Sequence, residues 1–354
     1  MRLSRLLVQN MRNIDLCSVE LGPTINLFVG ENGSGKTSVL ESVHFLSSAR
    51  SFRPAKGHTF IKQDADGCLV KGILESGQEM AVSMNKTRGR KMAAGGNVLK
   101  RTSELAHLLP VVVLGPQTIN LLTGGPEYRR RFLNWGVFHV EPAFRRVWEL
   151  GKRCLYQRNK LLKKPGVSFK DLASWSTEFV RLSEIIHGYR ASYIRSFSRS
   201  FRERVGITGM TGVDVKYEPG WNAERPLRDE LEAARALDVK RGFTSKGFHR
   251  ADLAVRLSNR EVSEFCSRGE LKRLAWALLL VQGEKLKSEV VYLVDDLTSE
   301  LDSDSRERIC NYLVNSGSQV LATGVDGKDL SACWGGIEKT MFHVEHGLIK
   351  RNSI

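Results

Sequence analysis

The sequence is poor in several features that mark particular protein classes. Its six cysteines are scattered and form no C-x-x-C pair, so neither a disulfide framework nor a zinc site is expected, and a reducing compartment is the default. No apolar run reaches the ~18 residues that a membrane span requires. Near the amino terminus only Leu6-Leu7-Val8 is continuously apolar, which is too short for the core of a signal peptide. We therefore expect a soluble, cytoplasmic protein.

Acidic residues are also scarce relative to basic ones. The chain has 54 lysines and arginines against 39 aspartates and glutamates, a net charge of +15, which favours a polyanionic partner. A hydrophobic content of 41% permits a full core, so a disordered protein is not expected. The 354 residues suffice for two domains, or for one domain with a large insertion.

The most informative stretch is residues 30–37, which match the G-x-x-x-x-G-K-[ST] phosphate-binding loop at every fixed position. A short apolar, β-rich run (24–29) precedes the loop and a helix-like pattern (37–43) follows it, which is the context that the motif requires. An ordinary glycine-rich turn before a helix is the disfavoured alternative, because strand, loop and helix are all present. The predicted nucleotide-binding residues are Gly30, Glu31, Asn32, Gly33, Ser34, Gly35, Lys36 and Thr37.

Each residue type in this loop has a chemical reason. The glycines let the chain fold tightly, so that backbone N–H groups converge on phosphate oxygens, and the dipole of the following helix adds positive potential. Lys36 would reach the β- and γ-phosphates, and the Thr37 hydroxyl would ligate Mg²⁺. The chain is therefore predicted to bind a nucleoside triphosphate with Mg²⁺.

A second set of site residues is expected after the run Val290–Asp296. This apolar, β-branched stretch ends in two carboxylates, as a fully buried parallel strand at a nucleotide site does. Asp295 is placed to hold Mg²⁺, through water, opposite Thr37. Asp296 would orient or deprotonate the attacking water.

Two shorter motifs complete the pattern. Ser267 and Gly269 open a strongly apolar helix and could form a second anion site, although an N-cap serine is the ordinary meaning of such a motif. Residues 299–302 read S-x-L-D. The order of phosphate loop, S-x-G-x helix, acidic strand and S-x-L-D is that of ABC-type ATPases. In that class Ser267 of one subunit would close on the γ-phosphate held by another, so an ATP-dependent homodimer is expected.

The middle of the chain, residues 126–205, is helical in pattern and strongly basic. Between positions 129 and 164 only Glu141 and Glu149 oppose the positive residues, and so one-sided an excess favours contact with DNA phosphates. These positive residues are Arg129, Arg130, Arg131, Arg145, Arg146, Lys152, Arg153, Arg158, Lys160, Lys163 and Lys164. A basic hairpin-like loop at 86–91 is a further candidate, with a solvated tip as the alternative.

The chain as a whole resembles the RecF family, the SMC-related ABC-type ATPases of bacterial recombinational repair. Besides the motifs above, the resemblance rests on the blocks 124–130, 157–162, 248–253 and 341–347. It implies an α/β fold: an ABC-type P-loop ATPase head with an inserted, mostly helical second lobe. It also implies a clamp-like protein that dimerises with ATP on DNA. Such a protein acts beside RecO and RecR, helps to load recombinase at single-strand gaps, and supports replication restart and the SOS response.

The expected domain boundaries follow the changes in pattern along the chain. We expect the ATPase head to be built from residues 1–118 and 240–354, with the basic helical lobe 119–239 inserted between them. Residues 1–20 alternate loosely and suggest two strands of an edge hairpin. Just beyond the phosphate-loop helix, Arg50 and Arg53 either turn back toward the nucleotide or are solvated, and the sequence leaves both readings open.

Several positions depart from the pattern of the family. Asn134 stands where aspartate is usual, and Phe248 stands where proline usually precedes His249. No switch histidine follows the predicted strand 319–323, and Thr323 is the nearest polar candidate. Asp296 is one methylene shorter than the glutamate of most ABC ATPases. The last two features indicate slow hydrolysis. We expect a weak, DNA-stimulated ATPase whose hydrolysis acts as a timer.

Two other classes of function compete with this interpretation. One is the ATPase subunit of a membrane transporter, against which the positive charge, the basic insertion and the whole-chain resemblance all argue. The other is a nucleotide-dependent scaffold that binds protein rather than DNA.

Overall fold

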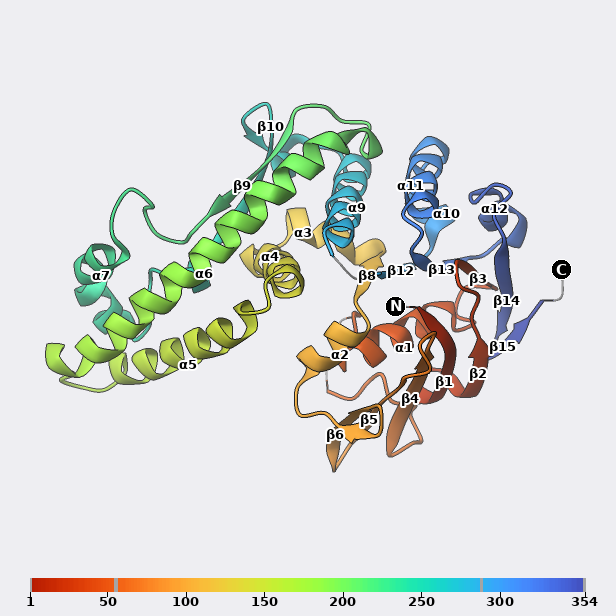
Figure 1. Ribbon diagram of the computed structural model, residues 1–354, viewed down its shortest axis with the longest axis horizontal. Helices are drawn as coiled ribbons and strands as arrows, with labels where there is room; N and C mark the ends of the chain where they lie inside the picture. Colours follow the sequence, from red (N-terminus) through yellow and green to blue (C-terminus); the bar gives the residue numbers. More distant parts are fainter. Residues whose placement is uncertain (1, 54–56, 287–288, 353–354) are drawn as a thin grey trace. The chain divides into compact units, whose positions relative to one another are not determined.

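The computed structural model describes residues 2–53, 57–286 and 289–352 (Figure 1). The chain divides into two compact units. The first comprises residues 1–118, 207–209 and 268–354, and the second comprises residues 119–206 and 210–267.

A six-stranded, mostly parallel sheet forms the centre of the first unit, in the order β15-β14-β3-β13-β12-β8. All neighbours pair in parallel except β14 and β15. Its strands are β3 (Ile25–Val29), β8 (Val111–Leu114), β12 (Val291–Val294), β13 (Gln319–Gly324), β14 (Lys339–Glu345) and β15 (Leu348–Arg351). β3, β12 and β13 are buried along their whole length, as is typical of parallel strands covered on both faces. Because these strands are parallel, the residues that follow them meet at one edge of the sheet.

An antiparallel six-stranded sheet, in the order β2-β1-β4-β5-β6-β7, forms a second layer of this unit. Its strands are β1 (Leu3–Met11), β2 (Ile14–Glu20), β4 (Gly67–Leu74), β5 (Glu79–Asn85), β6 (Gly89–Ala94) and β7 (Asn97–Val98). The predicted hairpin is present as β1 and β2, but only β2 lies at the edge, since β4 pairs with the other side of β1. That pairing joins residues 60 to 71 positions apart in the sequence, which a local hydrophobic pattern does not indicate.

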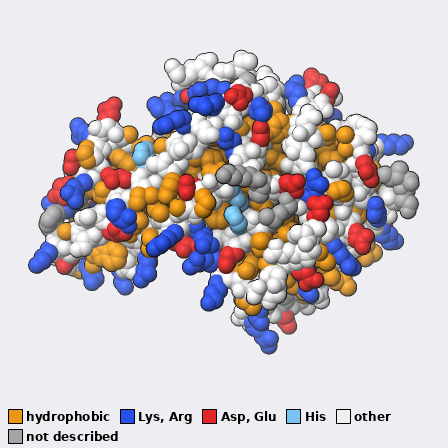
Figure 2. Space-filling model, in the orientation of Figure 1, with side chains coloured by type: hydrophobic (Ala, Val, Ile, Leu, Met, Phe, Trp, Pro, Cys, Tyr) orange, Lys and Arg blue, Asp and Glu red, His pale blue; other side chains and the backbone are white. Residues whose placement is uncertain are grey.

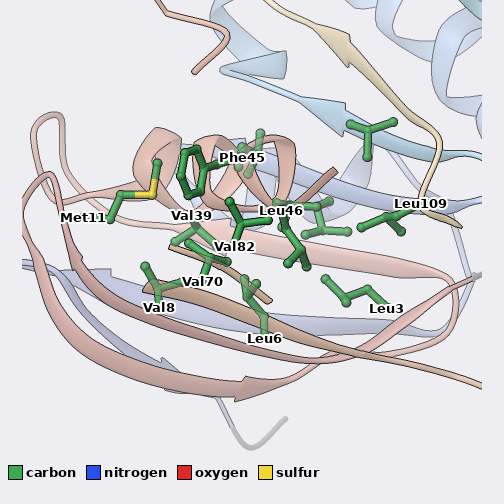
Figure 3. Packing of buried hydrophobic residues seen from close by; sticks show 14 of the residues in the cluster. Leu3, Leu6, Val8, Met11, Val39, Phe45, Leu46, Val70, Val82 and Leu109 are labelled. Carbon is green, nitrogen blue, oxygen red and sulfur yellow. The ribbon is translucent and has the colours of Figure 1, made fainter. Parts of the chain in front are cut away.

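Helix α1 (Lys36–Ser48) packs between the two sheets. Its Val39, Phe45 and Leu46 share one hydrophobic cluster with residues of the antiparallel sheet, such as Leu6 and Val70 (Figure 3). The same cluster includes side chains of β12 and β13 from the parallel sheet. Because α1 is covered on both sides, its first turn, which carries the phosphate-loop lysine, is fixed in direction.

The remaining helices of the first unit lie around the parallel sheet. They are α2 (Thr102–Leu108), η1 (Pro116–Ile119), α9 (Arg268–Glu284), α10 (Leu297–Glu300), α11 (Ser303–Asn315) and α12 (Gly327–Ala332). The predicted S-x-L-D segment joins α10 to α11, where the Asp302 side chain accepts the N–H of Ser305 and caps α11. Two ion pairs connect this segment to α9, Lys272–Glu300 (2.9 Å) and Arg273–Asp302 (3.3 Å).

The second unit is mostly helical, as the sequence predicts. Its helices are α3 (Asn120–Thr123), α4 (Pro126–Val140), α5 (Phe144–Leu162), α6 (Phe169–Glu203), η2 (Val205–Ile207), α7 (Leu227–Arg241), η3 (Phe248–Arg250) and α8 (Val262–Phe265). α5 and α6 form a long helical hairpin (Figure 1), which turns at Pro165 and Gly166, and Ser168 caps α6. A small antiparallel sheet, in the order β11-β10-β9, completes the unit.

The small sheet extends the inserted lobe beyond the carboxyl-terminal boundary that was predicted from the sequence. The inserted lobe was expected to end at residue 239, but residues 240–267 group with the second unit. The reason is that β9 (Val213–Glu218) pairs along its whole length with β10 (Asp252–Leu257), and β11 (Arg260–Glu261) continues the sheet. Arg129 of α4 adds an ion pair to Asp252, with Nε 2.7 Å from Oδ1.

A fully buried arginine in this unit is held by neutral groups. Arg190 donates from Nε and Nη2 to Oδ1 of Asn134 (3.1 and 2.6 Å) and from Nη1 to the carbonyl of Phe248 (2.7 Å). Its guanidinium lies 5.2 Å from the centroid of the Trp148 ring. Burial lowers the pKa of Arg190. The two unusual residues, Asn134 and Phe248, therefore both contact this arginine.

Restoring a carboxylate at position 134 should stabilise the protein. Asn134→Asp keeps the shape of the acceptor and gives Arg190 a charged partner, and hydrogen bonds to charged groups contribute about 1 kcal/mol more than neutral ones. We expect a rise of a few degrees in the midpoint of thermal unfolding, measured by circular dichroism. Asn134→Ala is the matched control and should lower the midpoint, because it leaves a buried cation without its acceptor. A lower midpoint for Asn134→Asp would show that desolvation of the carboxylate outweighs the ion pair.

Candidate nucleotide-binding site

The predicted phosphate loop lies between β3 and α1, at the carboxyl edge of the parallel sheet. Gly33 (φ 84°) and Gly35 (φ 119°) adopt left-handed backbone conformations that side chains disfavour. A Cβ on Gly30 would lie 2.1 Å from the carbonyl oxygen of Val344. The Ser34 hydroxyl is buried and has no hydrogen-bond partner in the described structure. A tight loop with an unsatisfied buried hydroxyl fits a bound phosphate.

The side chain of Lys36 folds back onto its own loop. Its Nζ donates to the carbonyl oxygens of Gly30 (2.7 Å) and Glu31 (2.8 Å), and only 7% of the residue is exposed. Burial lowers the pKa of Lys36, while the negative charges of Asp296 and Asp295 oppose that shift. Phosphate oxygens would replace the two carbonyls as acceptors, so the ammonium can bind a nucleotide without a change of fold.

The two predicted magnesium ligands are brought together. Asp295 follows β12, and its Oδ1 accepts the hydroxyl of Thr37, at the start of α1, at 2.9 Å. Burial raises the pKa of Asp295, and the hydrogen bond from Thr37 opposes the rise. A hydroxyl and a carboxylate oxygen are hard ligands that suit Mg²⁺. Among the described residues no cluster of three or more His, Cys, Asp or Glu side chains is placed to hold a metal ion.

Asp296 and Thr323 form one hydrogen-bonded unit with Asp295. The Thr323 hydroxyl donates to Asp295 Oδ1 (2.9 Å) and accepts the N–H of Asp296 (2.8 Å). Asp296 has a left-handed backbone (φ 56°, ψ 45°), and its Oδ1 accepts the hydroxyl of Ser299 (3.0 Å). Thr323 is fully buried. Its hydroxyl thus hydrogen-bonds to both aspartates. The sequence suggested Thr323 only as a candidate in place of a switch histidine and did not indicate this role.

The sequence also gave no signal for the residue that supports the outer side of the loop. Asn13, in the turn between β1 and β2, donates from Nδ2 to the carbonyl of Ser34 (3.0 Å) and accepts the hydroxyl of Ser38 (3.1 Å). The N–H of Gly347 donates to the same Ser34 carbonyl (2.8 Å). A Cβ on Gly347 would lie 2.1 Å from the carbonyl oxygen of Asn13, so this glycine allows close backbone contact. No motif connects these three regions of the sequence.

Ser267 and Gly269 lie at the start of α9. Ser267 immediately precedes the helix, Gly269 is in its first turn, and both are exposed. A Cβ on Gly269 would meet no atom within 4 Å. These residues are predicted to contact the γ-phosphate of a nucleotide that is bound by a second copy of the chain. Their role therefore stays a prediction.

The basic residues of the second unit separate into two groups. Many of the arginines already have partners within the unit, and five such pairs lie in or beside its long helices. These pairs are Arg129–Asp252, Arg158–Asp238, Arg181–Glu178, Arg190–Asn134 and Arg202–Asp214. By contrast, Arg145, Arg146, Lys152 and Arg153 on α5 have no carboxylate within 4 Å in the described part of the chain. Figure 2 shows that lysine and arginine side chains are spread over the drawn face, with acidic side chains interspersed among them.

The basic loop at 86–91 is the tip of the β5–β6 hairpin. Its lysines and arginines are exposed, and the Asn85 side chain holds the turn by accepting the N–H groups of Thr87 and Arg88. Arg88 and Lys91 line a hollow of about 270 Å³ on the sheet. The loop is therefore exposed, which leaves both predicted roles, a DNA contact and a solvated tip, open.

The chain is similar to known proteins over nearly its whole length. Residues 2–347 match the model of the RecF/RecN/SMC N-terminal domain. The chain is 38% identical over 360 residues to the DNA replication and repair protein RecF of Vibrio vulnificus (strain CMCP6), covering 99% of this chain and 100% of the relative. It is 37% identical to RecF of Stutzerimonas stutzeri (strain A1501), covering 99% of this chain and 97% of the relative.

Solved structures show the same fold. The recombination mediator protein RecF with ATP, of the RecFOR pathway, superposes with a TM-score of 0.88 at 23% identity, covering 99% of this chain and 98% of that chain. The Smc head domain of Pyrococcus furiosus, bound to the C-terminal domain of ScpA, gives a TM-score of 0.59 at 14% identity, covering 100% of this chain and 96% of that chain. In the described residues no helix is long and apolar enough to cross a bilayer. The predicted α/β ABC-type head with its inserted helical unit is confirmed, and the chain belongs to the RecF family within the RecF/RecN/SMC group.

Proposed function

We propose that this protein is a DNA-binding ATPase of replication and recombinational repair, in which ATP controls dimerisation on DNA. The observation that carries the proposal is the hydrogen-bonded chain Thr37–Asp295–Thr323–Asp296 beside the phosphate loop. Such an arrangement offers a hydroxyl and a carboxylate to a magnesium ion and a second carboxylate to a water molecule. These groups are those of a site that hydrolyses a nucleotide. A protein that only binds a nucleotide does not need the second carboxylate.

Different residues of the site would bind the phosphates, the magnesium ion and the attacking water. The backbone N–H groups of residues 30–35 and the Lys36 ammonium would hold the phosphates, with Thr37 and Asp295 holding Mg²⁺. The ion would bridge phosphate oxygens and neutralise the charge that develops on them. Asp296 would orient the attacking water and accept its proton. In an ATP-bound dimer, Ser267 and Gly269 of the other subunit would complete the site.

Two features support slow turnover. Asp296 is a shorter base than the usual glutamate, and Thr323, next to the position of a switch histidine, is buried between the aspartates. Hydrolysis then serves as a timer for release from DNA, stimulated by DNA itself. As in the relatives that carry the RecF name, we place this activity in DNA repair, in the cytoplasm. RecO and RecR are the proposed partners, with loading of recombinase at gaps and support of the SOS response as the outcome.

The DNA contact is proposed for the cations on α5. Nothing in the sequence resembles a recognition helix or a zinc finger that would read base edges, so these cations are expected to contact phosphates without sequence preference. Each phosphate neutralised adds about −0.9 to the slope of log affinity against log salt.

The test is the salt dependence of double-stranded DNA binding and of DNA-stimulated ATP turnover. Replacing Arg145, Arg146, Lys152 and Arg153 with alanine should reduce the magnitude of the slope by up to about 3 to 4, without changing ATP binding in the absence of DNA. A matched control replaces Lys100, Lys328, Lys350 and Arg351, which removes the same charge outside α5 and should leave the slope nearly unchanged.

Two outcomes would redirect the proposal. An unchanged slope in a folded α5 variant would move the DNA surface to the Lys86–Lys91 loop. A wild-type protein that binds ATP but shows neither DNA binding nor DNA-stimulated turnover would favour the protein scaffold.

A further inference from the structure

A three-residue segment next to the longest helix of the inserted lobe belongs to the ATPase unit. Residues 207–209 follow α6 and precede β9, two elements of the second unit, yet they group with the first unit. Ile207 is 8% exposed and Thr208 is fully buried. The chain thus leaves the second unit after residue 206, is anchored in the first unit, and returns at residue 210. We call residues 207–209 the anchor.

The helix before the anchor is suited to carry a displacement. α6 has 35 residues, which is about 50 Å at 1.5 Å per residue. α5, which bears the four cations proposed to contact DNA, packs against α6 as the other arm of the helical hairpin (Figure 1). Because packed interfaces are poorly compressible, a shift of α5 is passed on to α6. Only residues 204–206 separate the end of α6 from the anchor.

Within the first unit the anchor lies against Arg308 of α11. A Cβ placed on Gly209 would lie 3.5 Å from Nη2 of Arg308, so the anchor backbone and the guanidinium are close neighbours. The Arg308 side chain is exposed and forms no ion pair in the part of the chain that the structure describes. Its Nη2 donates to the hydroxyl of Ser305 (3.2 Å). Arg308 therefore connects the anchor to Ser305.

Ser305 connects Arg308 to the S-x-L-D segment. The fully buried Ser305 hydroxyl donates to Oδ2 of Asp302 (2.8 Å), and the Ser305 N–H donates to Oδ1 (3.0 Å). A hydroxyl can donate and accept at once, so it joins the guanidinium to the carboxylate. The same carboxylate pairs with Arg273 of α9 (3.3 Å), the helix that Ser267 precedes.

The other end of the S-x-L-D segment reaches the proposed base. The Ser299 hydroxyl donates to Oδ1 of Asp296 (3.0 Å). Two residues separate Ser299 from Asp302 in the sequence. A short segment is thus hydrogen-bonded at one end to the carboxylate proposed to act on water, and at the other end, through Ser305, to Arg308.

We propose that Arg308 is a positioning residue that couples DNA held by the second unit to ATP hydrolysis. DNA bound on α5 displaces α6, the anchor shifts against Arg308, and the bonds between Ser305 and Asp302 reposition the segment that contacts Asp296. The inference rests on the proposed DNA-stimulated hydrolysis and gives the route of that stimulation. Because Arg308 belongs to neither the proposed DNA surface nor the nucleotide loop, it acts on the stimulation alone.

The test measures ATP turnover against the concentration of double-stranded DNA. In Arg308→Ala, turnover without DNA should stay unchanged, while the maximal stimulation falls about fivefold or more, the lower end of usual coupling between sites. The DNA concentration that gives half of the maximal stimulation should also stay unchanged, because the α5 cations remain. Arg351→Ala is the matched control, since it removes another exposed arginine of the first unit and should keep the wild-type stimulation.

Two further variants test the route. Ser305→Ala keeps the N–H that caps α11 but removes the hydroxyl between Arg308 and Asp302, so it should cause a similar loss of stimulation. The double variant should lose no more than either single variant, since both changes remove the same link. Ile207→Ala loosens the anchor and should also lower the stimulation. If Ser305→Ala does not fold, Arg308→Ala and Ile207→Ala still decide the question.

Three results would overturn the inference. One is an unchanged maximal stimulation in Arg308→Ala. Another is an equal fall of turnover with and without DNA, which would make Arg308 a residue that only stabilises α11. A wild-type protein whose ATP turnover does not respond to DNA would remove the proposed function together with the inference, and so would be distinguishable from the first two.

Discussion

ATP turnover should fall by at least about 100-fold when Lys36 is replaced by arginine, although the charge is kept. The ammonium of Lys36 fits between the carbonyls of Gly30 and Glu31, at 2.7 and 2.8 Å, in a position that is almost closed to solvent. When phosphate oxygens replace these carbonyls, a planar guanidinium is too wide to take the place of the compact ammonium in the same geometry. Loss of one preorganised group that stabilises charge in a transition state typically costs 10²- to 10³-fold.

The measurement is phosphate release at saturating DNA, together with the thermal midpoint. Lys62→Arg is a suitable control, because Lys62 pairs with Asp15 on the protein surface and should tolerate the wider cation. Ordinary turnover by a folded Lys36→Arg protein would show that the 30–37 loop is not the hydrolytic site.

Asp296→Asn should retain ATP and lose hydrolysis by a factor of ~10²–10⁴, the usual contribution of a general base. The amide keeps the acceptor for the Ser299 hydroxyl and leaves the backbone bond to Thr323 in place. It cannot accept a proton from water. Sedimentation with ATP and DNA should then show a long-lived dimer on DNA, where the wild-type dimer dissociates as ATP is consumed.

The neighbouring carboxylate provides the matched control. Asp295→Asn replaces the residue that accepts the hydroxyls of Thr37 and Thr323, and should weaken binding of ATP in the presence of Mg²⁺. The two adjacent substitutions are thus expected to separate binding from hydrolysis. Faster release from DNA by Asp296→Asn than by the wild type would count against Asp296 as the hydrolytic residue.

The parts of the site that could be predicted are those with a local sequence signal. The phosphate loop is continuous in the chain, and the run before Asp295 is apolar enough to predict a buried parallel strand. Thr37 and Asp295 lie 258 positions apart in sequence, yet each belongs to a recognisable motif, so their contact could be expected.

Residues without a motif could not be predicted, because their roles depend on tertiary contacts. Asn13 supports the phosphate loop from the turn between two strands, and Thr323 joins two aspartates from a neighbouring strand. A glutamate within a helix is expected to be exposed to solvent. Glu41 is nevertheless fully buried, because two sheets pack around α1. The boundary expected at residue 239 was wrong for a related reason, since the pairing of β9 with β10 joins strands separated by α7.

The arrangement of β14 has a consequence for how this protein is made. The strand beside β3 is contributed by residues 339–345, and the Ser34 carbonyl is bound by Gly347. During synthesis the amino-terminal part of the chain emerges first. The phosphate loop therefore lacks this neighbouring strand until residues 339–345 have been synthesised. A chain that stops before these residues would carry the whole 30–37 motif and still lack the contacts that complete the loop.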